Sequence, residues 1–280
     1  MLVGFITIHF VVCSIGLVAN ILLLWLALTK SPRIMRPCSV LLTCKTITNC
    51  LVVFFDLMTI NTVKVGELEF HGLCTYINPH VCYISHIFML IFLNQNLIWL
   101  IVSYLFRYYI IYIKEPTVNS MLYSSGCLTI ITFCQASFWF LNPDLITLST
   151  VFILSMMSVT GILIILTYIW LRHYILKFIK LHEDSLTKEV KCLNKKLVEI
   201  IDFQVKMPIV IFTGTLCLAL PYYYQQLEVL KYVVTLSVLC YTLTSSLCYI
   251  YYLPPYKNFL VKKYKEISTV TETQITEIKK

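Results

Sequence analysis

The chain has 280 residues, of which 59% are hydrophobic and only 13% are charged, and its formal net charge is +8. A soluble domain of this size needs a polar exterior that this composition cannot supply, because soluble domains are about 45–50% apolar. We therefore predict one integral membrane domain and exclude a soluble enzyme or a nucleic-acid-binding protein.

Seven long apolar stretches organise the sequence. A helix of roughly 20 apolar residues crosses the 30 Å hydrocarbon core of a bilayer. We expect an all-α bundle of seven transmembrane helices within residues 1–260, followed by a cytoplasmic tail at 261–280. The predicted spans are 3–28, 38–60, 82–106, 121–141, 145–170, 207–225 and 231–252.

The cations give this bundle a direction. Nineteen of the 22 lysines and arginines fall in the first, third and fifth connections and in the tail, on one side of the predicted membrane. Lysine and arginine in short loops favour the cytoplasm, so we expect the N-terminus outside and the C-terminus inside. The net positive charge then indicates contact with anionic lipid of the inner leaflet and not with nucleic acid.

Polar residues in the first two spans point into the bundle. Lys45, Asn49 and Asp56 are spaced by four and seven, which places them on one face of the second span. Ionisable groups at membrane depth avoid lipid, so this face must meet protein. Asp56, near the outer end, is a candidate ligand-binding residue, and the alternative is ordinary hydrogen bonding between helices. Asn20 of the first span lies at a similar depth to Asn49, and the two amides are expected to share a hydrogen bond.

Two cysteines, Cys74 and Cys82, lie at the predicted outer face, where a disulfide can persist. A bridge between them would attach the second outer loop to the top of the third span. Two reduced cysteines are the alternative, and the sequence leaves both open.

The third span is the most polar. Because its polar groups occupy several faces, we expect it to be central and surrounded by protein. His86 and Met89, about one turn below the outer surface, are candidates for an outward ligand pocket, with plain packing as the alternative. Asn96 is expected to make a polar contact between helices, and Arg107 closes the span at its inner end.

The cytoplasmic half holds two further features. Pro221 removes a helix hydrogen bond in the sixth span and should kink it, which suits a moving part. An apolar stripe in the 171–206 connection predicts either a docking surface for an intracellular partner or an amphipathic hairpin on lipid. After the seventh span, Phe259, Leu260 and two following lysines are typical of a short helix on the inner leaflet.

Several local strings, in this order and spacing, resemble nematode chemoreceptors of the serpentine type. The resemblance is strongest to serpentine receptor class delta, with the str and h classes as near alternatives. The strings are Asn20-Ile21-Leu22-Leu23-Leu24 before Thr29-Lys30-Ser31-Pro32, Cys74-x-Tyr76 with Cys82, Ser103-Tyr104-Leu105-Phe106-Arg107-Tyr108-Tyr109-Ile110, and Pro255-Tyr256-Lys257.

The resemblance implies a G-protein-coupled receptor of the plasma membrane, in sensory cilia, that detects an external small molecule and signals to a heterotrimeric G protein. It implies no enzymatic activity and no cofactor. By the same resemblance, Arg107 corresponds to the arginine that takes part in activation. The outer connection between spans four and five departs from the family, because only about residues 142–144 remain where relatives usually have a longer loop. A non-functional receptor variant is therefore one alternative.

Two other functional classes fit less well. A small transporter or channel predicts an internal repeat with broken helices in matching positions, and the sequence has no such repeat. A membrane enzyme needs a cluster such as His-x-x-x-His or paired intramembrane carboxylates, and Asp56 is the only acid well inside a span.

Overall fold

Backbone amides have no water to bond inside lipid, so long apolar runs fold as helices that satisfy their own hydrogen bonds. The computed structural model describes residues 2–32, 35–64, 67–112, 117–140 and 228–263, together with isolated helical positions between 162 and 203. The long helices within these ranges are α1 (Leu2–Thr29), α2 (Arg36–Thr59), α3 (Pro79–Tyr112), α4 (Val118–Phe140) and α7 (Glu228–Tyr252).

The first four predicted spans and the seventh correspond to these five helices, and the ends differ by a few residues. The helices do not include residue 60, the last of the second span, or residue 141, the last of the fourth. Of the described helices, α1, α2 and the Pro79–Ser103 part of α3 are long and apolar enough to cross a membrane. The fifth and sixth spans lie almost wholly outside the described residues, as do Pro221, most of the 171–206 connection and the 142–144 connection. The boundaries of all seven spans therefore stay predictions.

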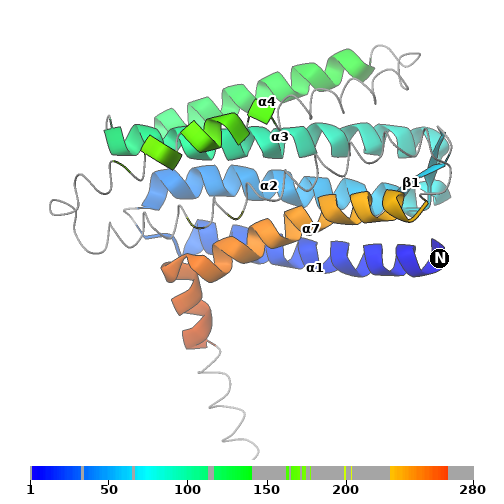
Figure 1. Cartoon of the computed structure of the whole chain (residues 1–280), viewed down its shortest axis with the longest axis horizontal. Coiled ribbons are helices and arrows are strands. Elements are labelled where there is room, and N and C mark those ends of the chain that lie inside the picture. Colours follow the sequence, from blue (N-terminus) through cyan, green and yellow to red (C-terminus); the bar gives the residue numbers. More distant parts are fainter. Residues whose placement is uncertain are drawn as a thin grey trace, which may run out of the picture.

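The helices run alongside one another (Figure 1). Helix α2 packs against α1 and α3, α7 packs against α1, and α4 packs against α2 and α3. The start of α1 lies at the same end of the bundle as β1 (Figure 1). We call this the outer end, following the orientation that the cations predict.

Helix α1 shows most directly why this bundle requires lipid. Its buried side chains recur every three or four residues along one stripe, and large apolar side chains on other faces are exposed. Ile8, Val18 and Leu28, for example, are 54%, 66% and 67% exposed. A soluble helix would place polar residues there, since extended exposed apolar surface marks a protein or membrane contact. The stripe faces α2 and α7, and a Cβ at Gly16 would meet Leu243 and Val53 at ordinary contact distance.

Helix α3 is the most enclosed of the three apolar helices, as its scattered polar groups predict. Its most apolar 18-residue stretch is 67% buried, against 39% for α1 and 44% for α2. His86, Gln95, Asn96 and Ser103 are all buried, although they lie on different faces. The expectation that the third span is surrounded by protein is confirmed.

At the inner end, a short helix over residues 254–263 leaves α7 and turns away from the bundle axis (Figure 1). The Tyr256 hydroxyl hydrogen-bonds the Ser31 hydroxyl over 2.8 Å, and the Phe259 ring lies 5.6 Å from that of Trp25. Burial raises the pKa of Tyr256, an effect that the Ser31 hydrogen bond opposes. The neutral phenol therefore attaches the end of α7 to the end of α1.

One predicted contact within the bundle is wrong. Asn20 is fully buried, but it donates to the carbonyl of Gly16 and accepts a short hydrogen bond from Ser246 of α7. In the described part of the chain, no hydrogen bond joins it to Asn49. Asn20 lies on the side of α1 that faces α7, where Ser246 is its partner.

This bond gives the first prediction. Ser246→Ala removes the only side-chain donor that the described residues offer to the Asn20 carbonyl oxygen and should lower the free energy of unfolding by about 0.6–1.7 kcal/mol, the range for hydrogen bonds between membrane helices. Thr244→Ala is the matched control, because that hydroxyl bonds only carbonyls of its own helix. Thermal unfolding in detergent measures both variants, and an equal loss in the control would contradict the role given to Ser246.

Candidate functional site

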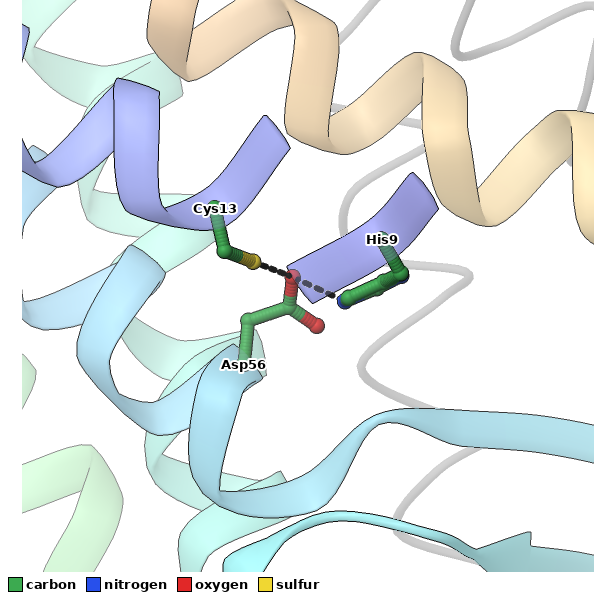
Figure 2. A group of neighbouring side chains, drawn as sticks. All are labelled: His9, Cys13 and Asp56. Atoms are coloured by element: carbon green, nitrogen blue, oxygen red, sulfur yellow. Dashed lines mark hydrogen bonds and ion pairs between the residues drawn. The ribbon is translucent and has the colours of Figure 1, made fainter. Parts of the chain in front are cut away.

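Three metal-ligating or titratable side chains converge near the outer ends of α1 and α2 (Figure 2). His9 Nε2 donates a hydrogen bond to Asp56 Oδ2 over 2.9 Å, and Cys13 Sγ donates to the same oxygen over 3.4 Å. His9 and Cys13 are completely buried, and Asp56 is 5% exposed. The carboxylate is thus held inside the bundle by two donors from the facing helix.

The local sequence explains this convergence. His9 and Cys13 are four residues apart, so they lie one above the other on the same face of α1. Asp56 lies one turn before Ile60, where α2 ends in a left-handed conformation with φ of 36°. Because α1 and α2 pack side by side, the outer turns of both helices meet at this point.

The placement of Asp56 both supports and corrects the sequence interpretation. Its face of α2 does point into the bundle, since Lys45 and Asn49 are each only 1% exposed. However, Asp56 offers little surface to water or to an external ligand, because it is only 5% exposed and its Oδ2 accepts hydrogen bonds from His9 and Cys13. Lys45 also stays buried, with its ammonium 5.2 Å from the centre of the Tyr249 ring.

The other two candidate ligand residues lie on α3 at the outer end. His86 and Met89 are 5% and 6% exposed. The ring of Phe70, from β2, contacts the ring of His86 with centroids 5.9 Å apart. The described side chains therefore enclose both candidates, and the second outer loop forms part of that enclosure.

That loop is a small outer cap. Strands β1 (Asn61–Lys64) and β2 (Glu67–Phe70) pair as an antiparallel hairpin, followed by the 3-10 helix η2 (Leu73–Tyr76). A disulfide joins Cys74 to Cys82, so the loop is attached to the start of α3 at the predicted pair. Gly72, just before η2, packs closely against the end of α2, because a Cβ there would come within 2.2 Å of the Met58 carbonyl oxygen.

A cavity of about 310 Å³ lies lower in the bundle, between α2, α3 and α4. Its walls include the rings of Phe88 and Phe92 and the polar groups of Thr48 and Gln95. The Trp99 indole nitrogen donates to the Thr48 hydroxyl over 3.1 Å at the inner side of this cavity. The volume is at the small end of the range for ligand pockets. His86, Met89 and Asp56 do not line it.

The remaining candidates are less defined. Asn96 is completely buried, and neither atom of its amide has a hydrogen-bond partner among the described residues. The side-chain carbonyl oxygen of Asn49 is also buried without a hydrogen-bond partner among the described residues. Arg107 lies in the inner part of α3, and Pro221 lies outside the described residues. The polar contact predicted for Asn96 and the roles of Arg107 and Pro221 stay predictions.

Sequence reasoning missed His9. His9 lies in an apolar run about two turns from the N-terminus, and the sequence interpretation treats it only as part of the first span. The signal that could have found it is its four-residue spacing from Cys13, which places a nitrogen and a sulfur donor on one face opposite the only acid well inside a span.

Comparison with known proteins decides the family. The family model for serpentine type 7TM GPCR chemoreceptors of the Srd class matches residues 5–147 and 142–262. The chain belongs to this family. The family is one of receptors and not of enzymes, and its members are seven-transmembrane proteins.

Two relatives illustrate how far this serpentine receptor matches its family. Serpentine receptor class delta-26 of Caenorhabditis elegans is 35% identical, over 90% of this chain and 88% of the relative. Class delta-28 of the same organism is 34% identical, over 94% of this chain and 92% of the relative. Among solved structures, squid rhodopsin is similar, with a TM-score of 0.57 and 16% identity over 95% of this chain and 85% of that chain. That likeness shows the seven-helix fold.

The family match has a break in it. The two matched segments meet at residues 142–147, where the sequence has its short outer connection. The alignment with class delta-26 is 281 positions long, whereas 90% of this 280-residue chain, about 252 residues, takes part in it. Roughly thirty positions (281 less 252) of the alignment therefore have no counterpart in this serpentine receptor.

The buried His9–Asp56 pair gives the second prediction. His9→Leu leaves a buried carboxylate with only the weak Cys13 donor and should cost about 3–5 kcal/mol of unfolding free energy. The double variant His9→Leu/Asp56→Leu should recover most of that loss, because no unpaired charge remains. Chemical unfolding in detergent gives the coupling energy of the cycle. Exposed His80 supplies the control His80→Leu, and simple additivity of the two losses would refute the pairing.

The outer disulfide gives the third prediction. It closes a loop with a sequence separation of 8, for which chain entropy gives a stabilisation of about 2–3 kcal/mol. Cys74→Ser/Cys82→Ser should lose that much, whereas Cys50→Ser, a cysteine within α2, should not. Maleimide labelling before and after reduction provides the direct check. If Cys74 and Cys82 label without reduction, the bridge is absent in the native protein.

Proposed function

We propose that this protein is a chemosensory G-protein-coupled receptor that binds an external small molecule and activates a heterotrimeric G protein from the plasma membrane of a sensory cell, in its cilium. Family membership over nearly the whole chain carries this proposal. The seven-helix fold supports it, because such a bundle connects a pocket on one side of the membrane to a coupling surface on the other.

For the ligand we propose a site at the outer end beside His86, Met89 and Asp56, which are enclosed in this structure and would have to be uncovered for a ligand to bind. Supporting this, all three lie near the outer end on α2 and α3, and the hairpin cap covers His86 through Phe70. If movement of the cap opened a pocket here, its few polar groups among apolar neighbours would suit a small organic molecule. Displacing Phe70 would open His86 to the outside, while the disulfide keeps the rest of the cap attached to α3.

At the inner end we propose that Arg107 takes part in G-protein coupling and that span six moves about Pro221. A ligand that prefers the state with span six swung outward would shift the receptor toward that state. The helices α1, α2, α3 and α7 are joined by buried contacts within the described residues, which suits a stationary frame. The amides of Asn20, Asn49 and Asn96 belong to this frame in the proposal.

A second candidate has a specific observation in its favour. The break in the family match at residues 142–147 and the roughly thirty unmatched positions suggest that the outer connection between spans four and five is shortened. In many bundles such a connection borders the ligand entrance. We therefore keep a receptor variant that reaches the membrane without responding as the alternative.

The fourth prediction separates these candidates. In cells that express the chain with a G protein and a second-messenger reporter, an odorant mixture should evoke a signal. Arg107→Ala should abolish the maximal signal, whereas His86→Ala should shift the effective concentration at least tenfold, because one residue acts in coupling and the other in binding.

The control is an N-terminal tag stained on unpermeabilised cells, together with Lys257→Ala as an exposed cationic position at the inner end. Surface staining with no response to any mixture favours the non-responding variant. Ion current without a G protein would overturn the receptor proposal.

A further inference from the structure

We propose that His9, Cys13 and Asp56 form a binding site for a thiophilic divalent cation of the Zn²⁺ type. Each residue supplies one donor of a kind that zinc accepts, namely an imidazole nitrogen, a thiolate sulfur and a carboxylate oxygen. The three donor atoms lie within 4.8 Å of one another, and all three residues are buried (Figure 2). This inference does not depend on the proposed receptor function.

Two of the three donor spacings are close to those around a tetrahedral ion, and the third, between His9 Nε2 and Cys13 Sγ, is within 4.8 Å. Zinc bonds of about 2.0 Å to nitrogen and oxygen and about 2.3 Å to sulfur place neighbouring ligand atoms roughly 3.3–3.5 Å apart in a tetrahedron. His9 Nε2 and Asp56 Oδ2 are 2.9 Å apart, and Cys13 Sγ and Oδ2 are 3.4 Å apart. For the nitrogen–oxygen pair, the histidine would withdraw by about 0.4 Å to reach this spacing.

The electrostatics also favour a cation. With neutral His9 the cluster carries the uncompensated charge of the Asp56 carboxylate, which is costly inside a membrane protein. When a divalent cation binds, the Cys13 thiol gives its proton to solvent and the thiolate coordinates, while neutral His9 carries its proton on Nδ1 instead of Nε2, which frees the Nε2 lone pair for the metal. One carboxylate, one thiolate and one divalent cation then sum to zero charge.

The backbone positions these ligands without rearrangement. Two ligands four residues apart on one helix reach the same ion, as in helical metal motifs, and the third comes from the adjacent turn of α2. His9 and Cys13 are fully enclosed, whereas the Asp56 side chain keeps 8% of its surface. The remaining coordination position would therefore face the Asp56 side, toward the outer cap.

A hydrogen-bonded pair of His9 and Asp56 is the simpler explanation of this cluster, but it does not account for two observations. It does not require Cys13 to aim its sulfur at the oxygen that His9 already bonds. It also leaves His9 Nδ1 buried with no hydrogen-bond partner among the described residues. A buried ring nitrogen without a partner shows that the hydrogen bonds of this cluster are not fully satisfied.

The test uses the full chain purified in detergent and titrated with Co²⁺, which reports thiolate ligation by a charge-transfer absorption. We expect one saturable site whose absorption Zn²⁺ displaces. Cys13→Ser should abolish the absorption, and Asp56→Asn and His9→Gln should each weaken binding at least tenfold. The matched controls Cys50→Ser and His80→Gln should bind as the original chain does.

A second readout covers variants that fold poorly. Zn²⁺ should raise the Tm of the unaltered chain and of both controls, because a ligand of the folded state stabilises it, and should leave the Tm of Cys13→Ser unchanged. A Co²⁺ absorption that survives Cys13→Ser, or the absence of any saturable absorption in the unaltered chain, would overturn the site. Because neither readout uses signalling, failure of the receptor proposal would not affect the result.

Discussion

The absence of water in the bilayer core is the constraint on which this structure depends. A buried carboxylate has to find its donors within the protein, and Asp56 finds them in His9 and Cys13 of the facing helix. That requirement fixes how α1 is rotated about its own axis. With His9 turned toward α2, the stripe through Gly16 and Asn20 also faces the bundle, and the large apolar side chains of α1 face lipid.

The same constraint explains what could be read from the sequence. Spacings of four and seven along α2 place Lys45, Asn49 and Asp56 on one face whatever surrounds them, so their burial could be predicted. The scattered polar groups of α3 likewise required a central position. The hydrogen-bond partners across helices could not be predicted, because they depend on how each helix is rotated about its axis, which a single sequence does not give. Asn20 therefore bonds Ser246 and not Asn49.

Loops follow different rules from helices. The outer position of Cys74 and Cys82 identified them as a candidate bridge from orientation alone. The hairpin between α2 and α3 was not predicted, because strands of four residues carry too little periodicity to be recognised. The role of Gly72 could not be predicted either, because it depends on a close approach to the Met58 carbonyl that only the three-dimensional structure shows. The candidate site was thus half predictable, with Asp56 and His86 identified and His9 and Phe70 not.

These contacts divide the bundle into parts with different freedom. Helix α1 is tied to α2 near the outer end through His9 and Asp56, to α7 at mid-depth through Asn20 and Ser246, and to the segment after α7 at the inner end through Ser31 and Tyr256. Three ties at three depths oppose both tilting and rotation of α1 against its neighbours. Any movement that carries a signal across the membrane would therefore have to pass through helices outside this frame. A cation bound by His9, Cys13 and Asp56 would strengthen the outermost tie, and it would do so at the level of the cap that covers His86.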